Sequence, residues 1–224
     1  MRGLSIAWFL AMVLVCSQSY RLPSASAEPE APKEAPEGMA LVPAGEFIYG
    51  PSEHEQQIVL PAFYMDIYEV TNQAYAKVRP HQYPEGKDKY PVVGPSWYDA
   101  QRYCEAVGKR LPTEQEWEKS ARGTDGRRYP WGDLFDPTKA NTGKRFGGIT
   151  PVDKFPEGRS PYGVYDLLGN VWEWTASEDG GNKVVRGGLW FDSVIGTKAS
   201  YRNAFPPRKH LDYLGFRCAK DGKP

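Results

Sequence analysis

Two stretches of sequence decide the fold: GKRLPTEQEWE at 108–118 and DLLGNVWEWT at 166–175. In the first, Thr113 and Glu116 have the spacing of a capping box, which predicts a helix that begins after Thr113 and stops at Gly123. The second lies within residues 123–190, where Gly, Pro, Asn, Asp and Trp dominate. So long a non-periodic stretch predicts a loop region organised by its own aromatic core or by metal ions.

Outward from these stretches, further caps and alternations predict a mixed α+β chain. Ser96 and Asp99 repeat the capping-box spacing before a helix that ends at Gly108, and Thr71 is a plausible N-cap for a short helix. Glu118 and Arg122 have the spacing of an ion pair along one helix. Strands are expected within 39–68, with a hairpin around Pro43–Gly45, and at 183–186, 199–203 and 214–219.

The composition fits one folded domain with many turns. The 224 residues include 40% hydrophobic and 13% aromatic side chains, enough for a core, with 23 Gly and 20 Pro. The 28 basic and 28 acidic residues give no net charge, so the chain lacks the basic footprint of nucleic-acid binding.

The N-terminus has the pattern of a targeting segment. Residues 1–27 combine an early Arg, an uncharged apolar run from Ile6 to Cys16 and a small-residue end at Ala25–Ala27, which predicts a cleaved secretory signal peptide. The apolar run is too short to span ~30 Å of hydrocarbon. An uncleaved anchor and lipid attachment at Cys16 are the alternatives. Residues 28–38 are a Pro/Glu/Ala linker and 39–222 the folded domain, so we expect an exported protein, periplasmic or extracellular, with no membrane contact after cleavage.

Without the signal peptide two cysteines remain, Cys104 and Cys218. Two cysteines in an exported chain most simply form one disulfide. Two free thiols that act as a nucleophile or as metal ligands are the alternative.

Seven segments together resemble the formylglycine-generating enzyme family, also called the sulfatase-modifying factor family. They are VPAGEF (42–47), EVTN (69–72), PVVGPSWYDAQRYCEAVGKRLPTEQEWEKSARG (91–123), YPWGD (129–133), TPVDKFP…GVYDLLGNVWEWT (150–175), RGGLW (186–190) and LGFRC (214–218). The resemblance implies a variant of the C-type-lectin-like α+β fold that is rich in loops. It also implies that Cys104 and Cys218 form a structural disulfide.

The same resemblance argues against the family's reaction. Its active members look like copper-dependent oxidases that convert a cysteine of a substrate protein to formylglycine with two thiols that follow an Arg-Gly-Gly motif. Those positions fall here on Asp192 and on or near Thr197. Oxygen ligands of this kind cannot supply copper–thiolate chemistry, so neither copper nor formylglycine generation is expected.

Calcium is the metal that the resemblance implies. One family site matches Asp166, Gly169, Val171 and Glu173, where two carboxylates and two main-chain carbonyls supply hard oxygen ligands. The alternative is that Asp166 caps a turn and Glu173 belongs to an ordinary ion pair. A second site would start at Asn141–Thr142, but Lys144 stands near the place of its downstream carboxylate.

The family's substrate cleft points to a recognition surface at Trp190, Asp192, Tyr201, Arg202 and Asn203, with a plain solvated loop as the alternative. The sequence offers no nucleophile or redox group there, which favours a non-catalytic module that binds a protein, peptide or glycan. The alternative is an accessory or maturation factor that acts on a partner protein or peptide without thiol chemistry, in which Asp192 is an acid, a base or a ligand of a hard metal. No oligomeric state is predicted.

Overall fold

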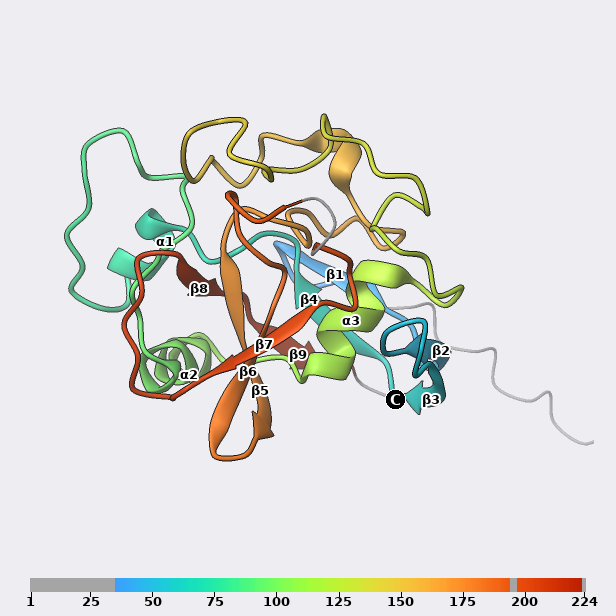
Figure 1. Ribbon diagram of the computed structural model, residues 1–224. Coiled ribbons are helices and arrows are strands. Elements are labelled where there is room, and N and C mark those ends of the chain that lie inside the picture. The colour runs from blue at the N-terminus through green and yellow to red at the C-terminus, as the bar shows by residue number, and fades with distance from the viewer. Residues whose placement is uncertain (1–34, 194–196, 223–224) are drawn as a thin grey trace, which may run out of the picture. The chain divides into compact units, whose positions relative to one another are not determined.

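The computed structural model describes residues 35–193 and 197–222, and these form the α+β, loop-rich fold that the sequence predicts (Figure 1). The predicted signal peptide and the first part of the linker lie outside the described residues, and the first strand begins at Met39. The described part of the chain contains no helix long and apolar enough to cross a membrane. The elements are β1 Met39–Val42, β2 Gly45–Tyr49, β3 Gln56–Leu60, β4 Phe63–Asp66, α1 Asn72–Ala76, α2 Trp97–Ala106, α3 Glu114–Arg122, the 3-10 helix η1 Pro156–Gly158, β5 Trp172–Asp179, β6 Asn182–Arg186, β7 Arg202–Phe205, β8 Leu214–Phe216 and β9 Ala219–Asp221.

The strands form three small sheets, ordered β1-β4-β9, β2-β3 and β7-β6-β5-β8. Only β5 and β8 pair in parallel among the described strands. The predicted hairpin around Pro43–Gly45 is wrong, because β1 pairs with β4 and β2 with β3. The buried ammonium group of Lys119 binds the carbonyl oxygens of Pro43 and Gly45, at 2.8 and 2.9 Å. This long-range contact holds the segment by which the chain passes from the sheet of β1 to the sheet of β2.

The helix predictions are confirmed by their caps. Ser96 and Thr113 each close a capping box at the start of α2 and α3, and Thr71 caps α1. Gly123 ends α3 with a φ of +70°, in the left-handed region.

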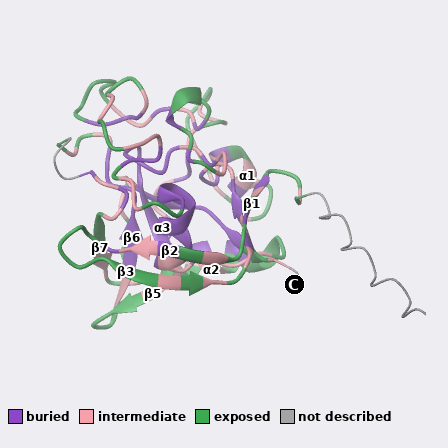
Figure 2. Cartoon of the chain, turned by 90° about the vertical axis from the view of Figure 1, so that its right-hand side faces the viewer, coloured by how far each residue is buried: buried purple, intermediate pink, exposed green. Residues whose placement is uncertain are grey.

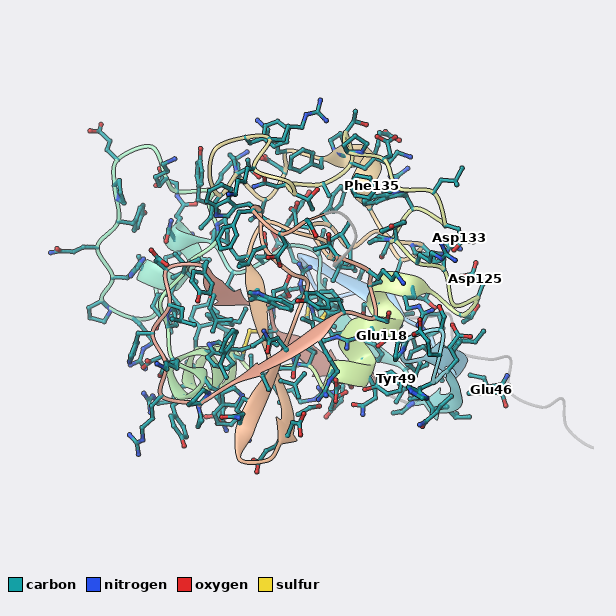
Figure 3. All side chains as sticks on the ribbon, in the orientation of Figure 1. Glu46, Tyr49, Glu118, Asp125, Asp133 and Phe135 are labelled. Carbon is teal, nitrogen blue, oxygen red and sulfur yellow. A yellow bond between two sulfur atoms is a disulfide. The ribbon has the colours of Figure 1, made fainter. Side chains whose placement is uncertain are left out.

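The predicted Glu118–Arg122 pair forms at 2.8 Å, but it is fully buried rather than on a helix surface. Glu118 also accepts from the main-chain N–H of Gly50 and pairs with Arg186. Figure 3 shows Glu118 on α3 close to Tyr49 on β2, whose pKa burial raises to about 12, with the Glu114 charge as the next cause.

At the C-terminal end the strand expected at 199–203 is displaced to Arg202–Phe205, and the single strand expected at 214–219 is two strands. The break falls at Arg217 and Cys218, both fully buried. Strand β8 joins the sheet of β5, whereas β9 joins the sheet of β4, so the chain passes from one sheet to another at this break.

Three apolar clusters are found in the described residues, and the two larger ones include residues of α2 and α3, with exposed loops around the buried segments (Figure 2). The first contains the disulfide between Cys104 on α2 and Cys218, with a Cα–Cα distance of 5.7 Å. The predicted disulfide is therefore present. Trp172 and Trp174 also belong to this cluster, while the second contains Trp117.

Candidate functional site

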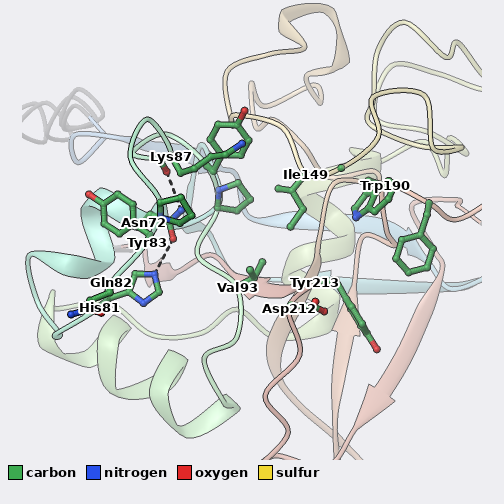
Figure 4. Close-up of a pocket in the computed structure, with 15 residues that line it drawn as sticks. Asn72, His81, Gln82, Tyr83, Lys87, Val93, Ile149, Trp190, Asp212 and Tyr213 are labelled. Carbon is green, nitrogen blue, oxygen red and sulfur yellow. Dashed lines mark hydrogen bonds between the residues drawn. The ribbon is translucent and has the colours of Figure 1, made fainter.

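A cavity of about 600 Å³ opens between the loop that follows α1 and the loops around residues 190 and 213 (Figure 4). Its volume lies in the range of small-ligand sites. The lining comes from five separate parts of the chain: Asn72, His81, Gln82, Tyr83, Pro84, Lys87, Tyr90, Pro91, Val93, Gly148, Ile149, Trp190, Phe191, Asp212 and Tyr213.

Asn72, the first residue of α1, holds the loop that forms one wall. Its side-chain amide donates to the carbonyl of Lys87 at 2.9 Å, and its main-chain N–H donates to the carbonyl of Tyr90 at 2.9 Å. Its side-chain oxygen lies 3.0 Å from Nε2 of His81. Thus one largely buried residue, through its side chain and its main-chain N–H, holds the 81–90 loop at both ends without a ligand.

Aromatic faces dominate the lining. His81 stacks on Tyr83 with ring centres 5.7 Å apart, and the ammonium of Lys87 lies 3.6 Å above the ring of Tyr90. On the opposite wall Trp190 and Phe191 meet edge to face at 5.1 Å. Burial lowers the pKa of His81, which favours its neutral imidazole. Such a surface suits an apolar or aromatic group with a few polar contacts at its edge.

Asp192 and Thr197, the residues that the resemblance places at or near the family's thiol positions, are both hydrogen-bonded within their own loop. Asp192 Oδ2 accepts from the N–H of Leu189 at 3.0 Å, and burial raises the pKa of Asp192. Thr197 is fully buried and donates to the carbonyl of Ser193 at 3.0 Å. Neither side chain lines the cavity. The described residues contain no free cysteine, since Cys104 and Cys218 are joined.

The residues expected to form a recognition surface are only partly brought together. Trp190 lines the cavity, whereas Tyr201 packs near Trp172 with ring centres 5.1 Å apart. Arg202 forms ion pairs with Glu114 and Asp179, each at 3.0 Å, and the side-chain oxygen of Asn203 accepts from the N–H of Ala204. The sequence argument missed the other wall. Its signal was the stretch HQYPEGKDKYP at 81–91, in which aromatic, cationic and acidic side chains alternate.

The residues of the two expected calcium sites do meet in space. Asn141 forms a parallel bridge with Gly169, and a Cβ on Gly169 would lie 2.1 Å from the carbonyl oxygen of Asn141, so only glycine fits there. Asn141 and Thr142 are both buried. The side-chain oxygens Oδ1 of Asn141 and Oδ2 of Asp166 are buried without a hydrogen-bond partner among the described residues. Two unpartnered hard oxygens fit a cation of the calcium type.

Glu173 fits that role less well, because its carboxylate is already bound. Arg217 donates to both of its oxygens, at 2.6 and 2.7 Å, and the indole N–H of Trp117 donates at 2.8 Å. Burial raises the pKa of Asp166 to about 8 and that of Glu69 well above its usual range, and the negative charges nearby add to the effect. Within the described ranges no group of three or more His, Cys, Asp or Glu side chains has a metal-binding arrangement.

These features define a loop-rich α+β protein of the C-type-lectin-like class. The chain shares this fold with Treponema denticola variable protein 1, with a TM-score of 0.71 and 21% identity over 82% of this chain and 95% of that one. PvdO from Pseudomonas aeruginosa gives a TM-score of 0.70 and 25% identity over 82% and 94%.

The family follows from the sequence match. Residues 23–222 match the family described as sulfatase-modifying factor enzyme 1-like domain, and the chain belongs to it. It is 44% identical over 160 residues to inactive C-alpha-formylglycine-generating enzyme 2 of Bos taurus, covering 62% of this chain and 53% of that protein. Formylglycine-generating enzyme of Mus musculus is 29% identical over 283 residues, covering 83% and 76%. The chain spans about half the length of the inactive relative.

Proposed function

We propose that this protein is a non-catalytic member of its family that binds a polypeptide segment in the aromatic cavity. One observation carries the proposal: Trp190 and Phe191 line an open cavity, while the two residues at the thiol positions, Asp192 and Thr197, are bonded to the main chain of their own loop. The site thus offers a binding surface without the groups that the family's oxidation needs.

A polypeptide is the ligand class that fits this family. Its active members act on a cysteine within a protein, and the cavity has the aromatic faces and sparse polar contacts that hold an apolar side chain. The alternative, a maturation factor, needs a poised acid or base. Three groups in the described lining could serve as an acid or base, but His81 is hydrogen-bonded to Asn72, Lys87 is held over Tyr90, and Asp212 lies apart from both in the sequence.

The proposal includes a structural Ca²⁺ ion near the cavity. Asp166 would be its principal side-chain ligand, with Asn141 and the carbonyls of Gly169 and Val171, whereas Glu173 would contribute mainly charge because Arg217 binds it. The unpartnered oxygens of Asp166 and Asn141 support this assignment. Calcium would hold the 141–142 and 166–173 segments together and take no part in a reaction.

We also propose that the protein is exported to the periplasm or the cell exterior. The signal-like segment at 1–27 supports export, and the Cys104–Cys218 disulfide is of the kind that persists in oxidising compartments.

The test is selection from a random dodecapeptide library displayed on phage, followed by fluorescence anisotropy with the enriched peptides. We expect Trp190→Ala to weaken binding at least about tenfold, because it removes a large aromatic face. Trp131→Ala is the matched control: Trp131 is also half-buried and stacks on an aromatic neighbour, Tyr129, but lies outside the cavity lining. Equal binding by wild type and Trp190→Ala, or no enriched peptide, would refute the assignment.

A further inference from the structure

We propose that the aromatic cavity continues into a basic subsite, formed by Arg79, Arg102 and Arg208, that binds the carboxylates of an acidic peptide segment. This inference rests on the proposed function and adds to it the charge of the ligand.

Shared lining residues connect the cavity to the basic groups. A hollow of about 400 Å³ shares His81 and Val93 with the aromatic cavity. The same hollow shares Asp99 and His210 with a further one of about 380 Å³. The three hollows therefore follow one another along the surface from the aromatic walls to the start of α2.

Positive charge exceeds negative charge at the far end of this groove. Arg79, Arg102 and Arg208 line the two smaller hollows, and Asp99 is the one acidic side chain in their described lining. Arg79 and Arg102 share Asp99 Oδ1, at 3.5 and 2.8 Å. Arg208 has no acidic partner within ion-pair distance in the described part of the chain, and its guanidinium lies 5.5 Å from the ring centre of Tyr98.

The carboxylate of Asp99, which pairs with Arg79 and Arg102, is also hydrogen-bonded at the start of α2. Asp99 Oδ2 accepts from the main-chain N–H of Ser96 at 3.2 Å and from its hydroxyl at 2.5 Å, as part of the α2 capping box. Asp99 therefore cannot turn away to neutralise Arg208. Two guanidinium charges are left over at the groove, each with donors that a carboxylate matches in pairs.

The loop that carries Arg208 is held in place. The N–H of Trp97 donates to the carbonyl of Pro207 at 3.0 Å, and Nδ1 of His210 donates to the carbonyl of Gly94 at 2.8 Å. These bonds fix the 207–210 segment against the start of α2. The three guanidinium groups are the permanently charged groups at this end of the groove, so we assign the recognition of the anion to them.

A peptide fits this arrangement better than a free anion does. The groove joins an apolar site to a cationic one, so one ligand that fills both gains from each, and a chain bearing an apolar side chain followed by acidic residues has that pattern. The arginines are partly exposed, with Arg102 at 54% and Arg79 at 35%, so solvent weakens their attraction. We expect the acidic residues to improve binding about fivefold to tenfold at low salt, and less as salt is added.

The experiment repeats the peptide selection on wild type, on the double variant Arg102→Gln/Arg208→Gln, and on Arg128→Gln. Arg128 is an exposed arginine outside all three hollows, so its substitution changes the net charge without touching the groove. We expect Asp and Glu to be enriched on wild type and Arg128→Gln, and to lose their enrichment on the double variant while apolar residues remain enriched. Fluorescence anisotropy of one enriched peptide and of its Asn/Gln analogue then gives the ratio of their dissociation constants. Inorganic phosphate is added as a competitor in a parallel titration.

Each outcome decides between the two proposals. Peptides that depend on Trp190 but carry no acidic preference would overturn the basic subsite and leave the binding function standing. An acidic preference that survives in the double variant, or is lost in Arg128→Gln, would show general charge attraction and also overturn it. If inorganic phosphate binds through these arginines while acidic and neutral peptides bind equally, the site is one for free anions and the proposal is wrong. A lack of Trp190-dependent peptides would overturn both.

Discussion

Replacement of Arg217 by methionine tests a buried charge whose hydrogen bonds are all made within the fold. Arg217 is fully buried and donates five hydrogen bonds: two to Glu173 and three to the carbonyls of Asp66, Ile67 and Tyr165. Methionine fills similar space but leaves the buried Glu173 carboxylate without its cation. Removal of one partner of a buried pair costs about 3–5 kcal/mol, and carbonyls left with fewer donors add about 1 kcal/mol.

We therefore expect Arg217→Met to lose about 4–6 kcal/mol of unfolding free energy, against a total of about 5–15 kcal/mol for a domain. Urea unfolding at pH 7, followed by tryptophan fluorescence, measures this loss. Lys89→Met is the matched control. Its pair with Asp153 has the same 2.6 Å separation as the Nε–Oε2 contact of Arg217, but the two side chains are 71% and 44% exposed. The control is expected to lose far less than Arg217→Met, because solvent screens its exposed pair.

Equal losses for the two variants would refute the reasoning, since burial and not distance is held to set the energy. The double variant Arg217→Met/Glu173→Leu checks the same point without relying on a folded single variant. Removal of both charges leaves no unpaired ion, so it should be more stable than Arg217→Met alone. If it is equally or less stable, the loss arises from packing.

Three further outcomes are expected. Cys104→Ala/Cys218→Ala should lower the free energy of unfolding by about 4–5 kcal/mol, because the disulfide closes a loop with a sequence separation of 114, and an unchanged urea midpoint would contradict this. The pKa of Asp99 is lowered: burial alone would raise it, but hydrogen bonds from Ser96 and Arg102 outweigh burial. Its stabilisation is therefore fully present above the unfolded pKa of about 3.9 and lost as pH falls through the lower folded pKa, so wild type and Asp99→Asn should converge in unfolding free energy only under acid conditions. After chelation, Ca²⁺ should raise the melting temperature of wild type more than that of Asp166→Asn, and Mg²⁺ should give little shift; equal Ca²⁺ shifts would remove Asp166 from the site.

The helices were predictable because their signals are local. A hydroxyl at the N-cap and a carboxylate three residues later fix each end within one turn, and Ser96–Asp99 and Thr113–Glu116 both form that box. Strand pairing was not predictable in the same way. The sequence between β1 and β2 has the residues of a tight turn, but the two strands belong to different sheets. Lys119, more than seventy positions away, binds the carbonyls of this connecting segment.

The site was predictable on one wall only. Trp190 follows the Arg-Gly-Gly motif, so the family resemblance located it. The wall at 81–93 has neither helical nor strand periodicity, and its order depends on the side chain of Asn72. The composition of 81–91 is unusual, but no local pattern reports that the side chain of Asn72 will hold this loop with its aromatic residues across the cavity from Trp190.

Asp192 and Thr197, which the family resemblance places at or near the thiol positions, have a structural role in their loop. The Asp192 carboxylate accepts from the N–H of Leu189, and the main-chain carbonyl of Asp192 accepts from the N–H of Gly143. Thr197 packs closely on Gly188, since a Cβ added at Gly188 would lie 2.5 Å from the Thr197 methyl group. These contacts brace the short segment that holds Trp190 and Phe191 at the cavity. A carboxylate is a stronger acceptor for a main-chain N–H than a thiol is. Asp192, which the family resemblance places at a thiol position, thus helps to hold the aromatic wall of the cavity.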